Sequence, residues 1–146
     1  MVIGGGPAGL VAARTAAIKG HDVSLYEASS HLGGQFRSAA YPIGKGELST
    51  TTSSYRANLE ALNVPVHLNS EVSEEMIQEI KPDAIILATG AKPMVPPIKG
   101  IDGKNVFTAE DMLLVNMIFL TMSHHDFFQL DSELFHHQLL LHHKQQ

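Results

Sequence analysis

The sequence has no cysteine and no tryptophan among its 146 residues. Without cysteine the chain has no disulfide, no thiolate nucleophile, no redox dithiol and no cysteine-bound iron–sulfur cluster. The same absence is typical of proteins from a reducing compartment. Basic residues are also few, because Lys and Arg total 10 against 15 Asp and Glu, which gives a formal net charge of −5. A chain with no basic stripe is not expected to bind nucleic acid.

Long apolar runs are missing as well. The longest, from Met112 to Met122, is interrupted by Asn116 and Thr121, and it is shorter than the roughly 20 residues that cross a bilayer. The N-terminus has neither a basic leader nor a long apolar segment, so no signal peptide is predicted. We therefore expect a cytoplasmic protein that does not enter a membrane.

The composition divides the chain into two zones. Residues 1–112 alternate apolar runs with Gly and Pro, as strand–helix units do, and we expect them to form one domain. Residues 113–146 have no glycine or proline and are rich in His, Leu, Phe and Gln. We expect this tail to be helical or disordered.

The first zone predicts an α/β fold with a parallel sheet and helices on both faces. The predicted strands are 1–4, 22–26, 66–68 and 84–88, with residues 71–72 also extended, and the last strand is expected to be buried because it is continuously apolar. A helix is predicted at 8–19, ended by Gly20. A second is predicted at 47–62, where Tyr55, Leu59 and Leu62 share one face. A third is predicted at 74–80, capped by Ser73. Glycines and prolines mark long loops at 33–46 and 92–103.

The clearest motif follows the first strand. Gly4, Gly6 and Gly9 match G-x-G-x-x-G, with apolar residues before them and an Ala-rich helix after them. In such a turn the first glycine permits the bend, the second lets a pyrophosphate approach the backbone, and the third lets the helix pack close to the sheet. The helix N-terminus then offers unpaired N–H groups to the phosphates.

An acidic residue completes this pattern. Glu27 ends the second predicted strand, where a carboxylate accepts hydrogen bonds from both ribose hydroxyls of an adenosine and disfavours a 2′-phosphate. The alternative is a solvated acid at a strand end. The motif and the acid together predict a dinucleotide site, but they do not separate FAD from NAD.

Several further segments point to a family. They are Val2 to Leu10 around the glycines, Tyr26-Glu27, Leu32-Gly33-Gly34-Gln35, Pro42 to Glu47, Asn69 to Val72, Leu87 to Gly90, Gly100 to Gly103 and Val106 to Met112. Together they resemble the FAD/NAD(P)-binding module of the group that contains 2,4-dienoyl-CoA reductase, trimethylamine dehydrogenase and enoate reductase. The resemblance covers residues 1–112. It implies a Rossmann-like fold and a flavin-dependent NAD(P)H oxidoreductase, which uses NAD(P)H in the full-length family.

The resemblance also assigns residues to the cofactor. It implies that Ala8 lies by its backbone at the pyrophosphate, that Glu27 binds the ribose, and that Val72 meets the adenine edge. The whole implied FAD-binding set is Gly4, Gly6, Pro7, Ala8, Gly9, Glu27, Gly34, Gln35, Lys45, Val72, Ala88, Thr89 and Gly90. Lys45 could instead be a solvated loop charge, Val72 could be part of the core, and Thr89 and Gly90 could be only a strand-ending turn.

The chain also departs from this family. Family members carry an FMN-bearing barrel, a 4Fe-4S segment and a second glycine motif for NAD(P)H, and no site for these groups is recognisable here. We therefore expect an incomplete fold, with a clipped first strand and an incomplete site for the isoalloxazine ring. The alternatives are an NAD-binding dehydrogenase domain and a catalytically inactive nucleotide-binding or interaction module.

No catalytic or metal-binding pattern is evident. The sequence has no Ser/His/acid arrangement, no H-E-x-x-H and no P-loop lysine, and in nicotinamide and flavin chemistry the cofactor itself carries the hydride. Three His pairs lie in the tail, at 124–125, 136–137 and 142–143. They match no metal motif, so we expect no metal site. Apolar tail residues such as Phe127, Leu134 and Leu141 could drive self-association.

Overall fold

The computed structural model describes residues 1–42, 44–103 and 106–113. The chain divides into two compact units. The first comprises Met1–Ala40 and Gly44–Ala91, and the second comprises Tyr41–Ile43 and Lys92–Gln146. The predicted tail 113–146 lies outside the described residues apart from residue 113.

A parallel sheet forms the centre of the first unit. Its strands are β1 (Val2–Ile3), β2 (Leu25–Tyr26), β3 (Val66–His67) and β4 (Ile86–Leu87), in the order β3-β2-β1-β4. All three pairings are parallel, and Val2 is in register with both Leu25 and Ile86. This is the order of the first four strands of a Rossmann fold, so the predicted α/β, Rossmann-like fold is confirmed.

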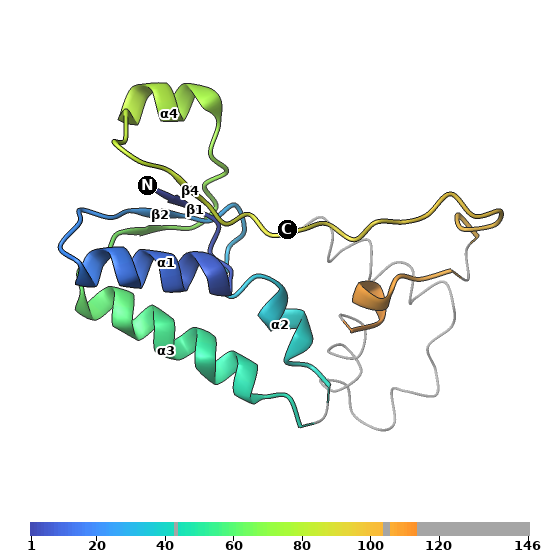
Figure 1. Cartoon of the computed structure of the whole chain (residues 1–146). Coiled ribbons are helices and arrows are strands. Elements are labelled where there is room, and N and C mark those ends of the chain that lie inside the picture. The colour runs from blue at the N-terminus through green and yellow to red at the C-terminus, as the bar shows by residue number, and fades with distance from the viewer. Residues whose placement is uncertain (43, 104–105, 114–146) are drawn as a thin grey trace. The chain divides into compact units, whose positions relative to one another are not determined.

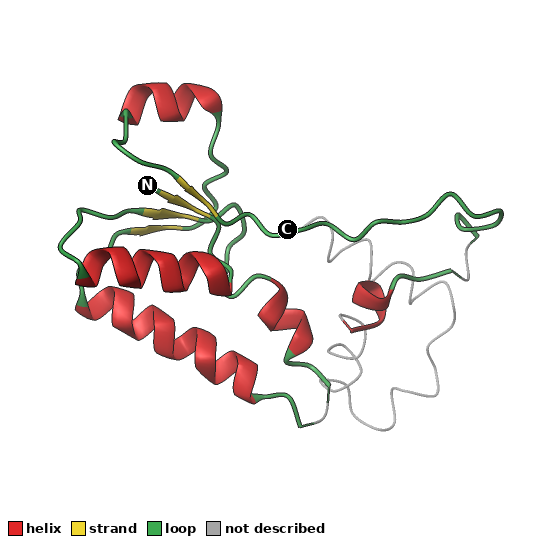
Figure 2. Ribbon diagram, in the orientation of Figure 1, coloured by secondary structure: helices red, strands yellow, loops and turns green. Residues whose placement is uncertain are grey.

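Helices lie on both sides of the sheet (Figure 1; Figure 2). Helices α1 (Pro7–Ile18) and α3 (Glu47–Ala61) pack against each other on one side, and α4 (Glu74–Ile80) lies on the other. A shorter helix, α2 (Gln35–Ala39), precedes α3. Gly20 follows the end of α1 and closes it. Gly20 has a φ of +87°, which suits a residue without Cβ, and its N–H donates to the carbonyl of Ala17.

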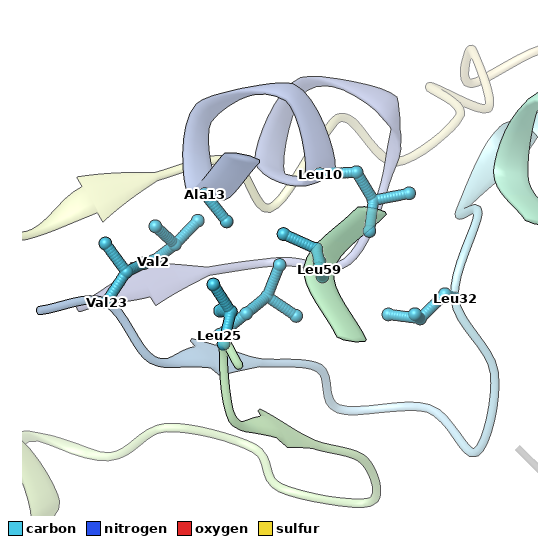
Figure 3. Close-up of a cluster of buried hydrophobic side chains, with 8 residues drawn as sticks. Val2, Leu10, Ala13, Val23, Leu25, Leu32 and Leu59 are labelled. Atoms are coloured by element: carbon cyan, nitrogen blue, oxygen red, sulfur yellow. The ribbon is translucent and has the colours of Figure 1, made fainter. Parts of the chain in front are cut away.

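The core lies between the sheet and the α1–α3 pair. Leu10 and Ala13 of α1 and Leu59 of α3 face the sheet residues Val2 and Leu25 (Figure 3). Tyr55 and Leu62 pack at the edge of this cluster, which confirms the predicted face of the second helix. Burial of these side chains fixes α1 against β1, and α1 begins at the glycine turn.

Two predictions about elements were wrong. Residues 33–46 are not one loop, because α2 forms directly after Gly34. Residues 71–72, predicted to be extended, belong to no helix or strand and precede Ser73, the N-cap of α4. Strand β4 is parallel as predicted but is not buried: Leu87 is 73 % exposed and Ile86 is 41 % exposed. It lies at the edge of the described sheet, where it has a neighbour on one side only.

Two other predictions hold. The Ser73 hydroxyl accepts a hydrogen bond from the Met76 N–H at 3.3 Å, so Ser73 caps α4 as expected. In the second unit, residues 92–100 are exposed and have no regular structure, as the prolines predicted.

A helix of the second unit begins at residue 109, and Thr108 caps it by exchanging hydrogen bonds with Asp111.

Candidate functional site

The glycine turn joins β1 to α1 at the carboxyl edge of the sheet. Gly4 adopts a φ of +108°, which disfavours any residue with a side chain. A Cβ on Gly4 would overlap the carbonyl oxygen of Ala88, and a Cβ on Gly9 would overlap the carbonyl oxygen of Gly4. Two glycines of the motif are therefore required by the packing of the chain itself.

Gly6 differs from these two glycines. A Cβ on Gly6 would find no heavy atom closer than the Cα of Gly34, at 4.0 Å. Among the described residues, therefore, no atom would exclude a side chain here. The open space lies beside the start of α1 and next to the double-glycine segment, where Gly34 adopts a φ of +49°. A ligand that approaches the backbone gives a physical reason for glycine at this position.

The N-terminus of α1 offers hydrogen-bond donors. Pro7 begins the helix, and Gly6, its N-cap, supplies no side-chain hydrogen bond. The first turn also contains no acidic residue. The N–H groups of Ala8 and Gly9 belong to the first turn, where no helical carbonyl is available to accept them. This arrangement presents partial positive charge to the open space at Gly6.

The carboxylate of Glu27 lies beside the same turn. Its Oε2 accepts a hydrogen bond from the N–H of Gly5 at 2.6 Å, and its Oε1 accepts one from the N–H of Ser29 at 2.8 Å. A carboxylate has about four acceptor positions. Two bonds fix the orientation of the group, and acceptor capacity is left for two hydroxyls.

Two segments far apart in the sequence meet next to the turn. The side-chain amide Nε2 of Gln35 donates to the carbonyl oxygen of Ala91 at 3.1 Å. Ala88 donates its N–H to Ile3 at 2.7 Å and packs on Gly4. The start of α2 and the end of β4 therefore flank the glycine turn. Thr89 and Gly90 follow directly, both exposed, and Gly90 has a φ of +74°.

The structure thus brings together most of the predicted residues. The group around the turn consists of Gly4, Gly6, Pro7, Ala8, Gly9, Glu27, Gly34, Gln35 and Ala88. Lys45 is exposed in the segment before α3, and its side chain makes no hydrogen bond or ion pair with the described residues. Val72 is half-buried between β3 and α4. Within the described ranges, no hydrogen bond or ion pair joins either residue to the glycine turn.

Three residues of this arrangement were not predicted. Gly5 and Ser29 supply the backbone N–H groups that orient Glu27, and Ala91 accepts from Gln35. Gly5 had a signal in the sequence, because it lies between the motif glycines. A Cβ there would lie 2.6 Å from Cδ2 of Leu32 and 3.0 Å from Oε2 of Glu27. A backbone donor such as Ser29 leaves no signature in residue type.

Other site types find no support in the described part of the chain. No cluster of three or more His, Asp or Glu side chains in it could hold a metal ion. The paired tail histidines lie outside the described residues. Between residues 1 and 113, excluding the undescribed positions 43 and 104–105, no helix has the length and apolar character needed to cross a membrane.

Comparison with known proteins defines the class. The sequence profile described as pyridine nucleotide-disulphide oxidoreductase matches residues 1–117. The match covers most of the chain, so the protein belongs to this family. Its members bind FAD and NAD(P)H. The recognised similarity to flavin-dependent reductases is thereby confirmed at the level of the family.

Individual relatives are reductases and oxidases. The chain is 44% identical over 115 residues to an NADH oxidase from Thermoanaerobacter brockii, covering 77% of this chain and 18% of that protein. It is 40% identical over 114 residues to a cinnamate reductase from Clostridium sporogenes, covering 78% of this chain and 17% of that protein. A 2-naphthoyl-CoA reductase structure matches with a TM-score of 0.73 and 35% identity, over 78% of this chain and 18% of that one. The chain therefore spans about a fifth of the length of these relatives.

Proposed function

We propose that this chain binds the ADP part of FAD and forms part of a flavin-dependent NAD(P)H oxidoreductase similar to the 2,4-dienoyl-CoA reductase group. One observation carries the proposal. Gly6 leaves open space that the described residues do not fill, between the donors of α1 and the carboxylate of Glu27. A diphosphate and its adjoining ribose have the charge and the hydroxyls that these groups complement.

Each residue then has a binding role. The backbone at Gly4, Gly6, Pro7, Ala8 and Gly9 encloses the diphosphate, with the N–H groups of Ala8 and Gly9 donating to it. Glu27 accepts from the two ribose hydroxyls while Gly5 and Ser29 hold it in place. Gly34, Gln35, Ala88, Thr89 and Gly90 line the two sides of the turn.

The roles of two residues rest on the resemblance alone. Lys45 supplies a positive charge to the diphosphate, and Val72 meets the adenine edge by its backbone. Because Lys45 is exposed and has no partner among the described residues, an ammonium on a flexible stem could reach a bound anion.

The chemistry of the whole protein comes from its cofactors. FAD, when bound, accepts or donates a hydride, and the protein supplies binding and orientation. The substrates we propose are unsaturated or amine compounds, with NAD(P)H as electron donor or acceptor. No residue of this chain is assigned a catalytic role, and no FMN or iron–sulfur site is proposed in it. The two-part division at residue 112 and the cytoplasmic location remain predictions.

Calorimetric titration with ADP, FAD and NAD tests the proposal. We expect ADP and FAD to bind and NAD to bind more weakly, because the site is proposed to serve FAD. Tighter binding of NAD would favour the dehydrogenase domain, and failure of all three would favour an inactive interaction module. We also expect the isolated chain to oxidise no NADPH, which an assay of NADPH absorbance checks in the presence of added FAD.

A further inference from the structure

Ala91 is the last residue of the first unit, and the chain leaves the unit at Lys92. Residues 89–91 come directly after the residues of β4 that pair with β1, and they make few hydrogen bonds among the described residues. In the part of the chain that the structure describes, the bond from Gln35 is the only hydrogen bond that joins residues 89–91 to the rest of the first unit. The carbonyl of Ala91 is therefore held from across the glycine turn by one side chain.

Gln35 is well placed for this task. It is the first residue of α2 and follows Gly34, whose Cα lies against Gly6. Its backbone position is thus fixed relative to the diphosphate-binding turn. The side chain is exposed, so packing gives it no other reason to be glutamine. This hydrogen bond joins two residues that are 56 positions apart in the sequence, and it connects the start of α2 to the segment after β4.

We propose that Gln35 is a positioning residue that fixes the exit of the chain after β4, so that the Ala88–Gly90 segment stays closed against the glycine turn. The inference rests on the proposed function for its effect on cofactor binding. One amide hydrogen of Gln35 donates to Ala91, and the second is left to donate to a phosphate oxygen. The side chain of Gln35 can therefore bind Ala91 and a phosphate oxygen at the same time.

The absence of cysteine makes a direct test possible. The substitution Lys92→Cys introduces a single cysteine at the exposed residue that follows Ala91, and this cysteine carries a nitroxide label. Electron paramagnetic resonance measures the mobility of the label in the absence of nucleotide. In this background Gln35→Met keeps the length of the side chain but removes the donor, and Gln35→Lys keeps a donor. Gln78→Met, on the exposed face of α4, is the matched control.

We expect a more mobile label in Gln35→Met, a label close to the parent in Gln35→Lys, and no change in Gln78→Met. The melting temperature should be the same in all four proteins. ADP should bind Gln35→Met several-fold more weakly, about 3- to 10-fold for one lost hydrogen bond. A label as immobile in Gln35→Met as in the parent overturns the proposal, even if ADP binding weakens, because the loss would then be a direct contact.

The two proposals fail separately. If the parent protein binds no ADP, the proposed function fails, and the mobility comparison still decides whether Gln35 holds the exit segment. If ADP binds and mobility does not respond to Gln35, only the positioning role is lost.

Discussion

The backbone N–H of Gly5 donates to Oε2 of Glu27 at 2.6 Å, and this bond joins the glycine turn to the end of β2. It fixes the carboxylate next to the open space at Gly6. An acid held in this way is already oriented before a ligand arrives, so less side-chain freedom is lost on binding. The relationship links the two parts of the dinucleotide motif that are far apart in the sequence.

Replacing Glu27 by Gln should weaken ADP binding by about 10- to 100-fold, the usual range for a lost hydrogen bond to a charged group. The amide nitrogen of Gln cannot accept a hydrogen bond, so either the Gly5 or the Ser29 N–H loses its acceptor, and so does a ribose hydroxyl on the same side. Calorimetry with ADP measures the loss.

Glu79→Gln is the matched control for this substitution, because Glu79 is an exposed acid on α4. It should leave the ADP affinity unchanged while altering net charge equally. Equal affinities for Glu27→Gln and the parent protein would show that Glu27 does not bind the ribose.

Gly9→Ala should destabilise the first unit by at least about 1–3 kcal/mol, the typical cost of overpacking a core. The added Cβ would overlap the carbonyl oxygen of Gly4, so α1 would have to move away from the turn. Urea denaturation followed by circular dichroism gives the free energy of unfolding.

Gly46→Ala provides the comparison for this change. Gly46 has a φ of −56°, and a Cβ there would meet no atom of the described residues within 4 Å. Its effect should stay within about 1 kcal/mol. If both alanine variants unfold at the same urea concentration, the close packing inferred for Gly9 is wrong.

The sequence was sufficient where local pattern and packing agree. Helices α1 and α3 were predicted within a residue or two, because α1 is Ala-rich and ends at Gly20 and α3 carries Tyr55 and Leu59 on one face. Helix α2 was missed. It has only five residues, too few for any periodicity to emerge, and it begins directly after Gly33 and Gly34, which signal a turn.

The burial of β4 could not be read from its residues. The apolar run at 84–88 predicted a covered strand, but burial depends on whether another element lies beside it. In the described sheet nothing follows β4, and Leu87 is exposed. For the site, residue types located Glu27 and the glycines, whereas the donors from Gly5 and Ser29 are backbone groups that only the folded geometry reveals.

One buried and one exposed leucine test this description of burial. Leu59→Ala should lower the free energy of unfolding by about 2–5 kcal/mol, because a fully buried leucine would leave a cavity between α3 and the sheet. Leu87→Ala should cost less than about 0.5 kcal/mol, as for a surface substitution. Thermal and urea unfolding measure both. A cost for Leu87→Ala as large as for Leu59→Ala would show that β4 is covered in solution.

The start of α4 gives a prediction about pH. The hydroxyl of Ser73 lowers the pKa of Glu75 from its ordinary value, and the backbone N–H of Glu75 adds to the effect. A carboxyl whose pKa is lowered in the folded state stabilises that state above its unfolded pKa, and the contribution is lost as the pH falls through the folded pKa. The contribution of this carboxylate to the start of α4 should therefore be lost in acid.

Ser73→Ala tests the assigned cause, because it removes the hydroxyl that lowers the pKa of Glu75 and that accepts from the Met76 N–H as the cap of α4. The pKa of Glu75 should rise toward its ordinary value, which NMR titration of its side-chain carboxyl measures. The exposed Ser54 of α3 supplies the control, and Ser54→Ala should leave the titration of Glu75 unchanged. An unchanged pKa of Glu75 in Ser73→Ala would mean that the hydroxyl does not cause the shift. The helix dipole, which favours a carboxylate in the first turn of α4, would then be the remaining cause.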